Sequence, residues 1–171
     1  MKLSPNSLTF IALTNEYCQA IESVATYERD YFVALMLKLL PRIYITASDV
    51  EADSGYSDCY IDSQLDEETY LQVRDAIAQV MGDEDVYLEV MVADMKYSDV
   101  PIATSISENL SDLYQEFYNF IASARDMPTD VQQELVDVCK ENFCNYWSQT
   151  LCNVLRSLNN IYYNTTLNNE Y

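Results

Sequence analysis

The chain has 171 residues and carries 28 acidic side chains against nine basic ones, with no histidine and a formal net charge of −19. Without histidine, the commonest proton shuttle and the commonest metal ligand are both missing, which argues against imidazole-based catalysis and imidazole metal sites. The negative charge repels phosphate backbones and anionic lipid headgroups, so we expect no nucleic-acid partner and no membrane partner, and a basic protein is the favoured one.

The length predicts a single domain over residues 1–171, large enough to bury a sizeable hydrophobic core. The five cysteines include no Cys-x-x-Cys pair, which fits a reducing compartment better than a disulfide framework. An apolar patch from Leu8 to Leu13 is too short for a signal sequence or a membrane span. We therefore expect a cytoplasmic protein.

Apolar residues recur every three or four positions over long stretches with few glycines and prolines, a pattern typical of helices. The sequence predicts an all-α fold, an irregular bundle of about five main helices. Asp66 and Ser105 are suitable N-cap residues, and Gly82 is suited to end a helix. In chain order, the five helices are expected to include residues 10–24, 32–43, 66–80, 105–125 and 131–161.

Three segments do not fit the helical pattern. Residues 48–65 hold five acids and no base and are predicted to form an acidic loop. Residues 86–92 are rich in β-branched and apolar side chains, so they could form a strand. Its expected partner is Cys59–Ile61, which would place a short two-stranded ribbon beside the bundle. Residues 164–171 lack an apolar stripe and are predicted to be a frayed tail.

Carboxylates recur at helical spacing in two rows. Like charges three or four residues apart on a helix repel one another mildly. The usual explanation for such a row is a solvated face opposite the apolar stripe, and the alternative is a docking surface for a basic partner. The first row consists of Glu108, Asp112 and Glu116, and the second of Asp130, Glu134, Asp137 and Glu141.

No metal or cofactor motif is complete. A calcium loop starting at Asp49 would need glycine where Ser54 stands and glutamate where Tyr60 stands. Serine or cysteine catalysis lacks its usual neighbouring base. We expect no cofactor, no metal and no catalytic residue that sequence can nominate. A carboxylate pair acting alone or with a divalent cation stays open as an alternative.

The connection before the helix at 105–125 is the candidate binding site. It gathers a base, two acids, a phenol and a hydroxyl: Asp94, Lys96, Tyr97, Ser98 and Asp99. Polar residues on a connection held by rigid helices are where function tends to reside. The alternative is an internal ion pair and turn that positions the following helix.

Four runs carry a resemblance to a known family. They are VYLEVMVADMKYSDVPIATSISENLSDLYQEFYNFI at 86–121, CKENFCNYWSQTLCNVLRSL at 139–158, NEYCQAIE at 15–22 and LMLKLLPRIY at 35–44. Together they resemble the bacterial domain of unknown function 5063. The resemblance implies a single-domain, bacterial, intracellular protein, and it brings no catalytic or binding residue with it.

For function, the sequence favours a protein-binding or adaptor module over an enzyme. A binding module should expose flat acidic faces, whereas a carboxylate-based enzyme should have a pocket where carboxylates with divergent pKa values converge. A third hypothesis, mimicry of nucleic acid, follows from charge alone and requires acids spaced like phosphates along one edge.

Overall fold

The computed structural model describes residues 2–52, 58–89 and 100–168, with side chains as far as residue 164. This part of the chain contains six α-helical segments, and a π-helical turn (Phe143–Trp147) joins the last two into one continuous helix. The predicted all-α fold with five main helices is therefore confirmed. The segments are α1 (Pro5–Glu22), α2 (Arg29–Asp49), α3 (Glu67–Met81), α4 (Ile106–Ala124), α5 (Thr129–Asn142) and α6 (Ser148–Asn168).

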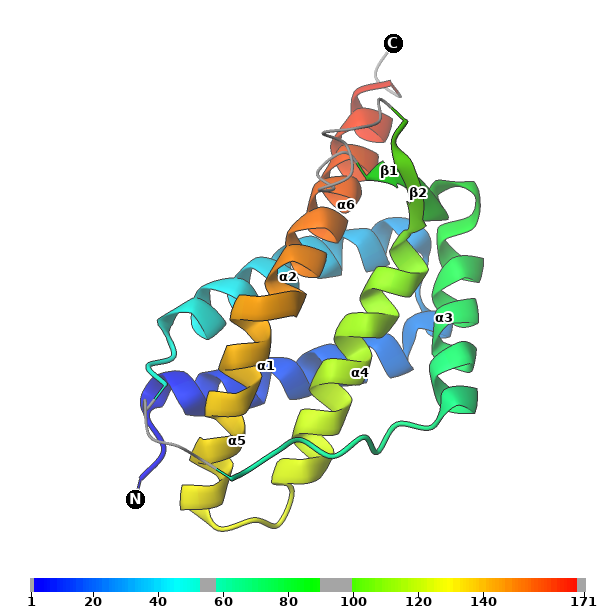
Figure 1. Cartoon of the computed structure of the whole chain (residues 1–171). Helices are drawn as coiled ribbons and strands as arrows, with labels where there is room; N and C mark the ends of the chain where they lie inside the picture. The colour runs from blue at the N-terminus through cyan, green and yellow to red at the C-terminus, as the bar shows by residue number, and fades with distance from the viewer. Residues whose placement is uncertain (1, 53–57, 90–99, 169–171) are drawn as a thin grey trace.

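The helices are arranged in two layers (Figure 1). Helix α4 lies beside α3 on one side and the continuous α5–α6 helix on the other, while α1 and α2 cross behind them. Helix α1 packs against α4, and α2 packs against both α1 and α6. The hydrophobic core fills the space between the layers.

Local sequence signals set the ends of α3 and α4. The Asp66 carboxylate accepts a hydrogen bond from the Thr69 amide at 2.7 Å, and the Ser105 hydroxyl accepts one from the Glu108 amide at 3.1 Å. Gly82 ends α3 with a φ of +59°, a left-handed conformation that glycine adopts without steric cost. The predicted caps at these three positions are confirmed.

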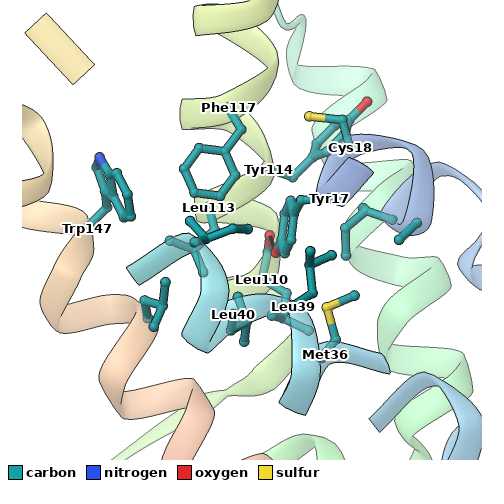
Figure 2. Packing of buried hydrophobic residues seen from close by; sticks show 14 of the residues in the cluster. Tyr17, Cys18, Met36, Leu39, Leu40, Leu110, Leu113, Tyr114, Phe117 and Trp147 are labelled. Carbon is teal, nitrogen blue, oxygen red and sulfur yellow. Dashed lines mark hydrogen bonds between the residues drawn. The ribbon is translucent and has the colours of Figure 1, made fainter. Parts of the chain in front are cut away.

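The centre of the core is aromatic. Trp147 is fully buried and lies against Phe10, Phe117 and Phe143, with ring centroids 6.2, 5.0 and 4.7 Å away. Figure 2 shows Trp147 and Phe117 beside the leucines of α2 and α4. The buried Tyr17 hydroxyl donates to the Leu110 carbonyl at 2.8 Å, so its polar atom is satisfied in the core.

The π-helical turn keeps the long C-terminal apolar stripe facing the core. From Val131 to Leu151, the stripe advances by five successive steps of four residues. An α-helix has 3.6 residues per turn, so each such step overshoots a full turn by about 40°, and the stripe would rotate away from the core. A π turn takes up one extra residue and reverses about 100° of this drift. As a result Cys139, Phe143 and Trp147 are all buried.

The two-stranded ribbon exists, but its predicted pairing with Cys59–Ile61 is wrong. Strand β1 (Val86–Glu89) pairs antiparallel with β2 (Ile102–Ser105), with Val86 opposite Ser105. The two strands lie at the ends of one short connection, so the chain closes a smaller loop than pairing with residues 59–61 would require.

Residues 58–65 run along α4 instead of joining the ribbon. The Asn119 carboxamide oxygen accepts hydrogen bonds from the Gln64 and Leu65 amides at 2.9 and 2.8 Å, and the Ser123 hydroxyl accepts one from the Asp62 amide at 3.2 Å. This part of the predicted acidic loop is therefore tied to α4. The first residues of the prediction differ too, since α2 continues to Asp49.

At the other end of the chain, α6 continues to Asn168, beyond the point where the frayed tail was predicted to begin. Residues 169–171 lie outside the described part of the chain.

Helix α2 is long and apolar enough to cross a membrane by length and composition, and among the described residues it is the single such helix. In this fold it is a core helix: Phe32, Met36, Leu40 and Ile43 are completely buried against the rest of the bundle. A core helix of a folded domain satisfies the same length and composition criteria.

Candidate functional site

The predicted binding residues Asp94, Lys96, Tyr97, Ser98 and Asp99 lie outside the described part of the chain. Their role stays a prediction. The residues that flank this connection are described, and they include the ribbon and the beginning of α4.

The ribbon borders a cavity of about 410 Å³ between β1 and α6. Its polar lining includes Glu89, Asn153 and Arg156. The Glu89 carboxylate accepts a hydrogen bond from the Asn153 carboxamide, which ties the end of β1 to α6. This contact fixes one end of the connection that carries the predicted site.

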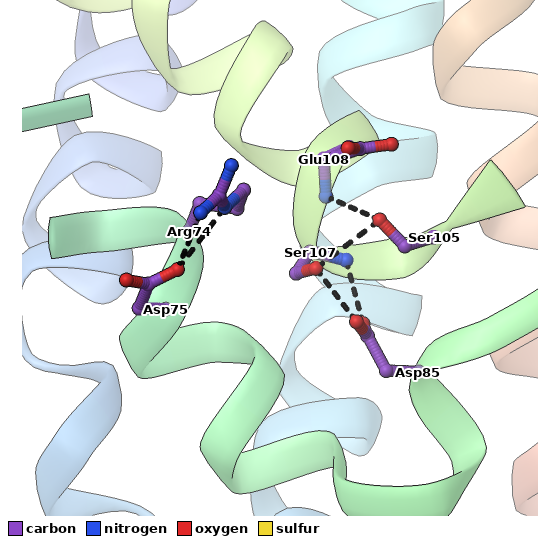
Figure 3. Close-up of polar contacts among 6 residues, drawn as sticks. All are labelled: Arg74, Asp75, Asp85, Ser105, Ser107 and Glu108. Carbon is purple, nitrogen blue, oxygen red and sulfur yellow. Dashed lines mark hydrogen bonds and ion pairs between the residues drawn. The ribbon is translucent and has the colours of Figure 1, made fainter. Parts of the chain in front are cut away.

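At the other end of this connection, hydrogen bonds fix the start of α4 (Figure 3). The Asp85 carboxylate accepts hydrogen bonds from both the amide and the hydroxyl of Ser107, at 2.8 and 2.7 Å. A carboxylate at a helix N-terminus satisfies free amides and interacts favourably with the helix dipole. Ser105 and Asp85 together anchor the ribbon to α4.

Helix α4 carries the most unusual polar cluster among the described residues. Glu108 is exposed, but Asp112 and Glu116 are half-buried, so the expectation of a solvated row is wrong for these two. The Tyr70 hydroxyl of α3 donates to Asp112 at 2.7 Å, and the Asn142 carboxamide at the end of α5 donates to Glu116 at 3.4 Å. The two neighbouring helices therefore cover the row from both sides.

The environment of this α4 carboxylate pair, Asp112 and Glu116, is unfavourable for negative charge. Burial raises the pKa of the Asp112 carboxyl and the Glu108 charge raises it further, although the Tyr70 hydrogen bond opposes the shift. Burial also raises the pKa of Glu116, with a contribution from Asp112. Among the described residues, the ion pairs are Arg29–Asp30, Arg42–Glu16 and Arg74–Asp75, and none of them neutralises the pair.

The π-helical turn lies next to the α4 pair. Tyr146 of this turn is close enough to Asp112 and Glu116 that their charges, together with burial, raise the pKa of its phenol. π-Helical turns are rare and frequently occur at functional sites, although this one also has the packing role described above. The turn thus contributes to a polar site formed by α3, α4 and the continuous α5–α6 helix.

Sequence reasoning missed the partners of the α4 pair. Tyr70 lies in the helix expected over residues 66–80, and the sequence predicted no role for Tyr70, Asn142 or Tyr146 in a site. The repeated four-residue step before Trp147 was a signal for the irregular turn. No local pattern connects Tyr70 with Asp112, which is 42 residues away in sequence.

The second carboxylate row behaves as expected. On α5, Asp130, Glu134 and Glu141 are exposed and Asp137 is half-buried. Lys140, the base within this row, turns away and donates to the Ala47 and Ser48 carbonyls at the end of α2, at 2.6 and 2.8 Å. The row is therefore a largely solvated acidic surface.

No three His, Cys, Asp or Glu side chains come together to hold a metal ion in the part of the chain that the structure describes. The structure describes all five cysteines, and they form no disulfide bond.

A family model for a domain of unknown function, DUF5063, matches residues 1–164, almost the whole chain. The chain belongs to this family. The resemblance found in the four sequence runs is thereby confirmed.

This DUF5063 chain is also similar to a solved structure, the crystal structure of protein BF1032 from Bacteroides fragilis. The two are 28% identical, the match covers 92% of each chain, and the TM-score is 0.79. A comparison with curated proteins finds no match. Because the family description names no activity, functional inference for this DUF5063 chain depends on its own geometry.

The α4 pair leads to a pH-dependent stability prediction. A carboxyl whose pKa is raised by folding destabilises the folded state above that pKa, and this cost vanishes below its pKa in the unfolded chain. Asp112→Asn and Glu116→Gln should therefore each increase the free energy of unfolding at pH 7, by at least a few tenths of a kcal/mol from relief of like-charge repulsion. The gain should shrink as the pH falls through the raised pKa toward the ordinary carboxyl range, as measured by urea unfolding between pH 3 and pH 7.

The control for this prediction is Glu51→Gln, an exposed acid beyond α2. It should change stability little at any pH. Equal gains from Glu51→Gln and Asp112→Asn would mean that overall charge, and not the environment of the α4 pair, sets the effect.

Proposed function

We propose that this protein is a protein-binding module whose partner presents lysine or arginine side chains to the α4 carboxylate pair and the acidic surface of α5. The observation that carries the proposal is the α4 pair itself: two half-buried carboxyls with raised pKa values and no ion pair to a base among the described residues. A cation placed beside them would relieve an existing electrostatic cost.

The charge of the molecule supports the same class of function. Helix α5 carries exposed acids, and Asn142 at its end contacts Glu116 directly. With a net charge of −19, the molecule attracts basic partners over a distance of about one Debye length, roughly 8 Å at physiological salt.

The carboxylate-enzyme alternative receives less support. An acid and a base in one active site require environments that push their pKa values apart, whereas Asp112 and Glu116 shift in the same direction. The described residues also hold no three-ligand metal cluster that would assist such chemistry. A binding role is therefore the better interpretation of the α4 pair.

The test uses a short lysine-rich peptide as probe and isothermal titration calorimetry as readout. The double variant Asp112→Asn/Glu116→Gln should weaken binding about fivefold to tenfold more than the charge-matched control Asp83→Asn/Glu84→Gln, two exposed acids after α3, because the α4 carboxyls are partly desolvated. Affinity for the native protein should rise with pH through the raised pKa range, since the cation binds the ionised carboxyls and releases protons.

Two results would contradict the proposal. Equal losses in both double variants would mean that the peptide recognises net charge alone. A native lysate passed over the immobilised protein at low salt should also yield a basic protein that is retained by the Asp83→Asn/Glu84→Gln control and lost by the α4 double variant. Retention by both would remove the α4 pair from the binding surface.

A further inference from the structure

A second polar hollow lies on the opposite flank of α4 from the carboxylate pair. Tyr114 and Tyr118 each follow a member of the pair by two positions, which turns them about 200° around the helix. They border a cavity of about 410 Å³ between α1, α3 and α4. The remaining lining comes from Ile21, Glu22, Thr69, Gln72 and Val73.

Two tyrosine rings form one side of this hollow. The ring centroids of Tyr114 and Tyr118 are 5.6 Å apart and the rings are tilted by 45°, so the two rings pack against each other. Tyr114 is almost completely buried, which fixes its ring, and Tyr118 is half-buried. Ile21 and Val73 supply apolar surface on the adjoining helices.

Glu22 provides the single formal charge in the described lining of the hollow. The Tyr114 hydroxyl donates to its Oε1 at 3.0 Å and thereby orients the carboxylate, while the side chain stays exposed to solvent. Glu22 takes part in no ion pair with a described base. A negatively charged group beside two aromatic rings and apolar walls is an environment that attracts organic cations.

We infer that this hollow binds an alkylammonium group, with Glu22 accepting its charge and the Tyr118 ring contacting its methylene or methyl groups. A simple anion is disfavoured by Glu22 and by the net charge of the protein. The carboxylate gives an ammonium group an ionic contact that a neutral ligand such as a sugar would lack.

The position of Arg125 indicates on which side of the hollow the cation binds. A smaller hollow of about 190 Å³ adjoins the first, and Glu22, Tyr118 and Arg125 all belong to its lining. The guanidinium repels a cation on that side, so the ammonium group binds on the α3 side, where Thr69 and Gln72 offer polar side chains. This inference is independent of the proposed function, because it concerns other residues on the opposite flank of α4.

The test titrates the full chain with n-butylammonium and, as a neutral isostere, n-butanol, following side-chain tyrosine signals by NMR. Butylammonium should give saturable shifts at Tyr114 and Tyr118, and butanol should bind much more weakly. Glu22→Gln, which keeps an oxygen for the Tyr114 hydroxyl, should weaken binding about tenfold. Tyr118→Leu should weaken it about threefold to fivefold.

The controls match each change. Glu67→Gln removes an exposed charge from the start of α3, and Tyr31→Leu removes an exposed ring from α2, and both should leave binding unchanged. Urea unfolding confirms that every variant is folded. Equal binding of butanol, equal losses from Glu67→Gln, or the absence of saturable shifts would each overturn the inference.

A further arm separates the two sources of such a group. A capped peptide with one lysine competes with butylammonium if the hollow receives a protein side chain, and it fails to compete if the hollow accepts only free amines. The Asp112→Asn/Glu116→Gln variant keeps this hollow. Loss of peptide binding in that variant therefore tests the proposed function separately from this inference.

Discussion

Replacing Trp147 with alanine should lower the free energy of unfolding by about 4 kcal/mol, the largest loss that we expect from a single substitution. The indole is fully buried among Phe10, Phe117 and Phe143, and its Nε1 donates to the Cys139 carbonyl at 3.2 Å. Alanine would leave a cavity at the point where α1, α4 and the π-helical turn meet, and would remove the indole hydrogen bond. Urea unfolding followed by circular dichroism measures the loss.

The matched control is Tyr60→Ala, an aromatic truncation at a side chain that is 72% exposed. It should cost less than about 0.5 kcal/mol. A loss below about 2 kcal/mol for Trp147→Ala would show that the surrounding rings collapse into the cavity and that this aromatic cluster is not the centre of the core.

Asn119→Leu should destabilise the fold by about 2 to 3 kcal/mol, although the two side chains are similar in size. The Asn119 oxygen accepts from both the Gln64 and Leu65 amides, and leucine would leave these two donors without their acceptor. Besides the lower unfolding free energy, hydrogen exchange at the Gln64 and Leu65 amides should accelerate. Exchange in the centre of α4 should be affected only through the global change.

The control for Asn119 is Asn159→Leu, the same substitution at an exposed position of α6, which should shift stability by less than about 0.5 kcal/mol. Unchanged exchange at Gln64 and Leu65 in Asn119→Leu would mean that residues 58–65 are held on α4 by other contacts, and would contradict this assignment.

Much of the fold was predictable because its causes are local. The Asp66 and Ser105 caps and the left-handed Gly82 depend on neighbours within one helical turn. The apolar stripes depend only on helical periodicity, and the long stripe ending at Ile161 is buried along nearly its whole length. These signals were sufficient for the number and order of the helices.

Local sequence signals did not determine which segment pairs with β1 in the ribbon. The extended segment at Val86–Glu89 was visible in its β-branched residues, but its partner was not, because many segments can supply strand hydrogen bonds. Asn119 holds residues 64 and 65 on α4 and so removes the nearby competitor from the ribbon. That choice depends on a side chain more than 50 residues away.

The candidate site was predictable only in part. Spacing placed Glu108, Asp112 and Glu116 on one face of a helix, but the solvent exposure of that face was misjudged for two of the three. Tyr70 and Asn142 come from helices on either side, and their positions follow from packing and not from sequence spacing. The hollow at Glu22 was not foreseen, because α1, α3 and α4 form it jointly.

The sequence by itself determined the helices, the caps at Asp66, Ser105 and Gly82, the negative charge and membership of the DUF5063 family, since each depends on composition or on neighbours within a few residues. Only the tertiary structure decided which carboxylates are desolvated and which aromatic rings surround Glu22. Desolvation and cavity shape depend on how separate helices pack, and packing brings together residues whose distance in sequence carries no signal.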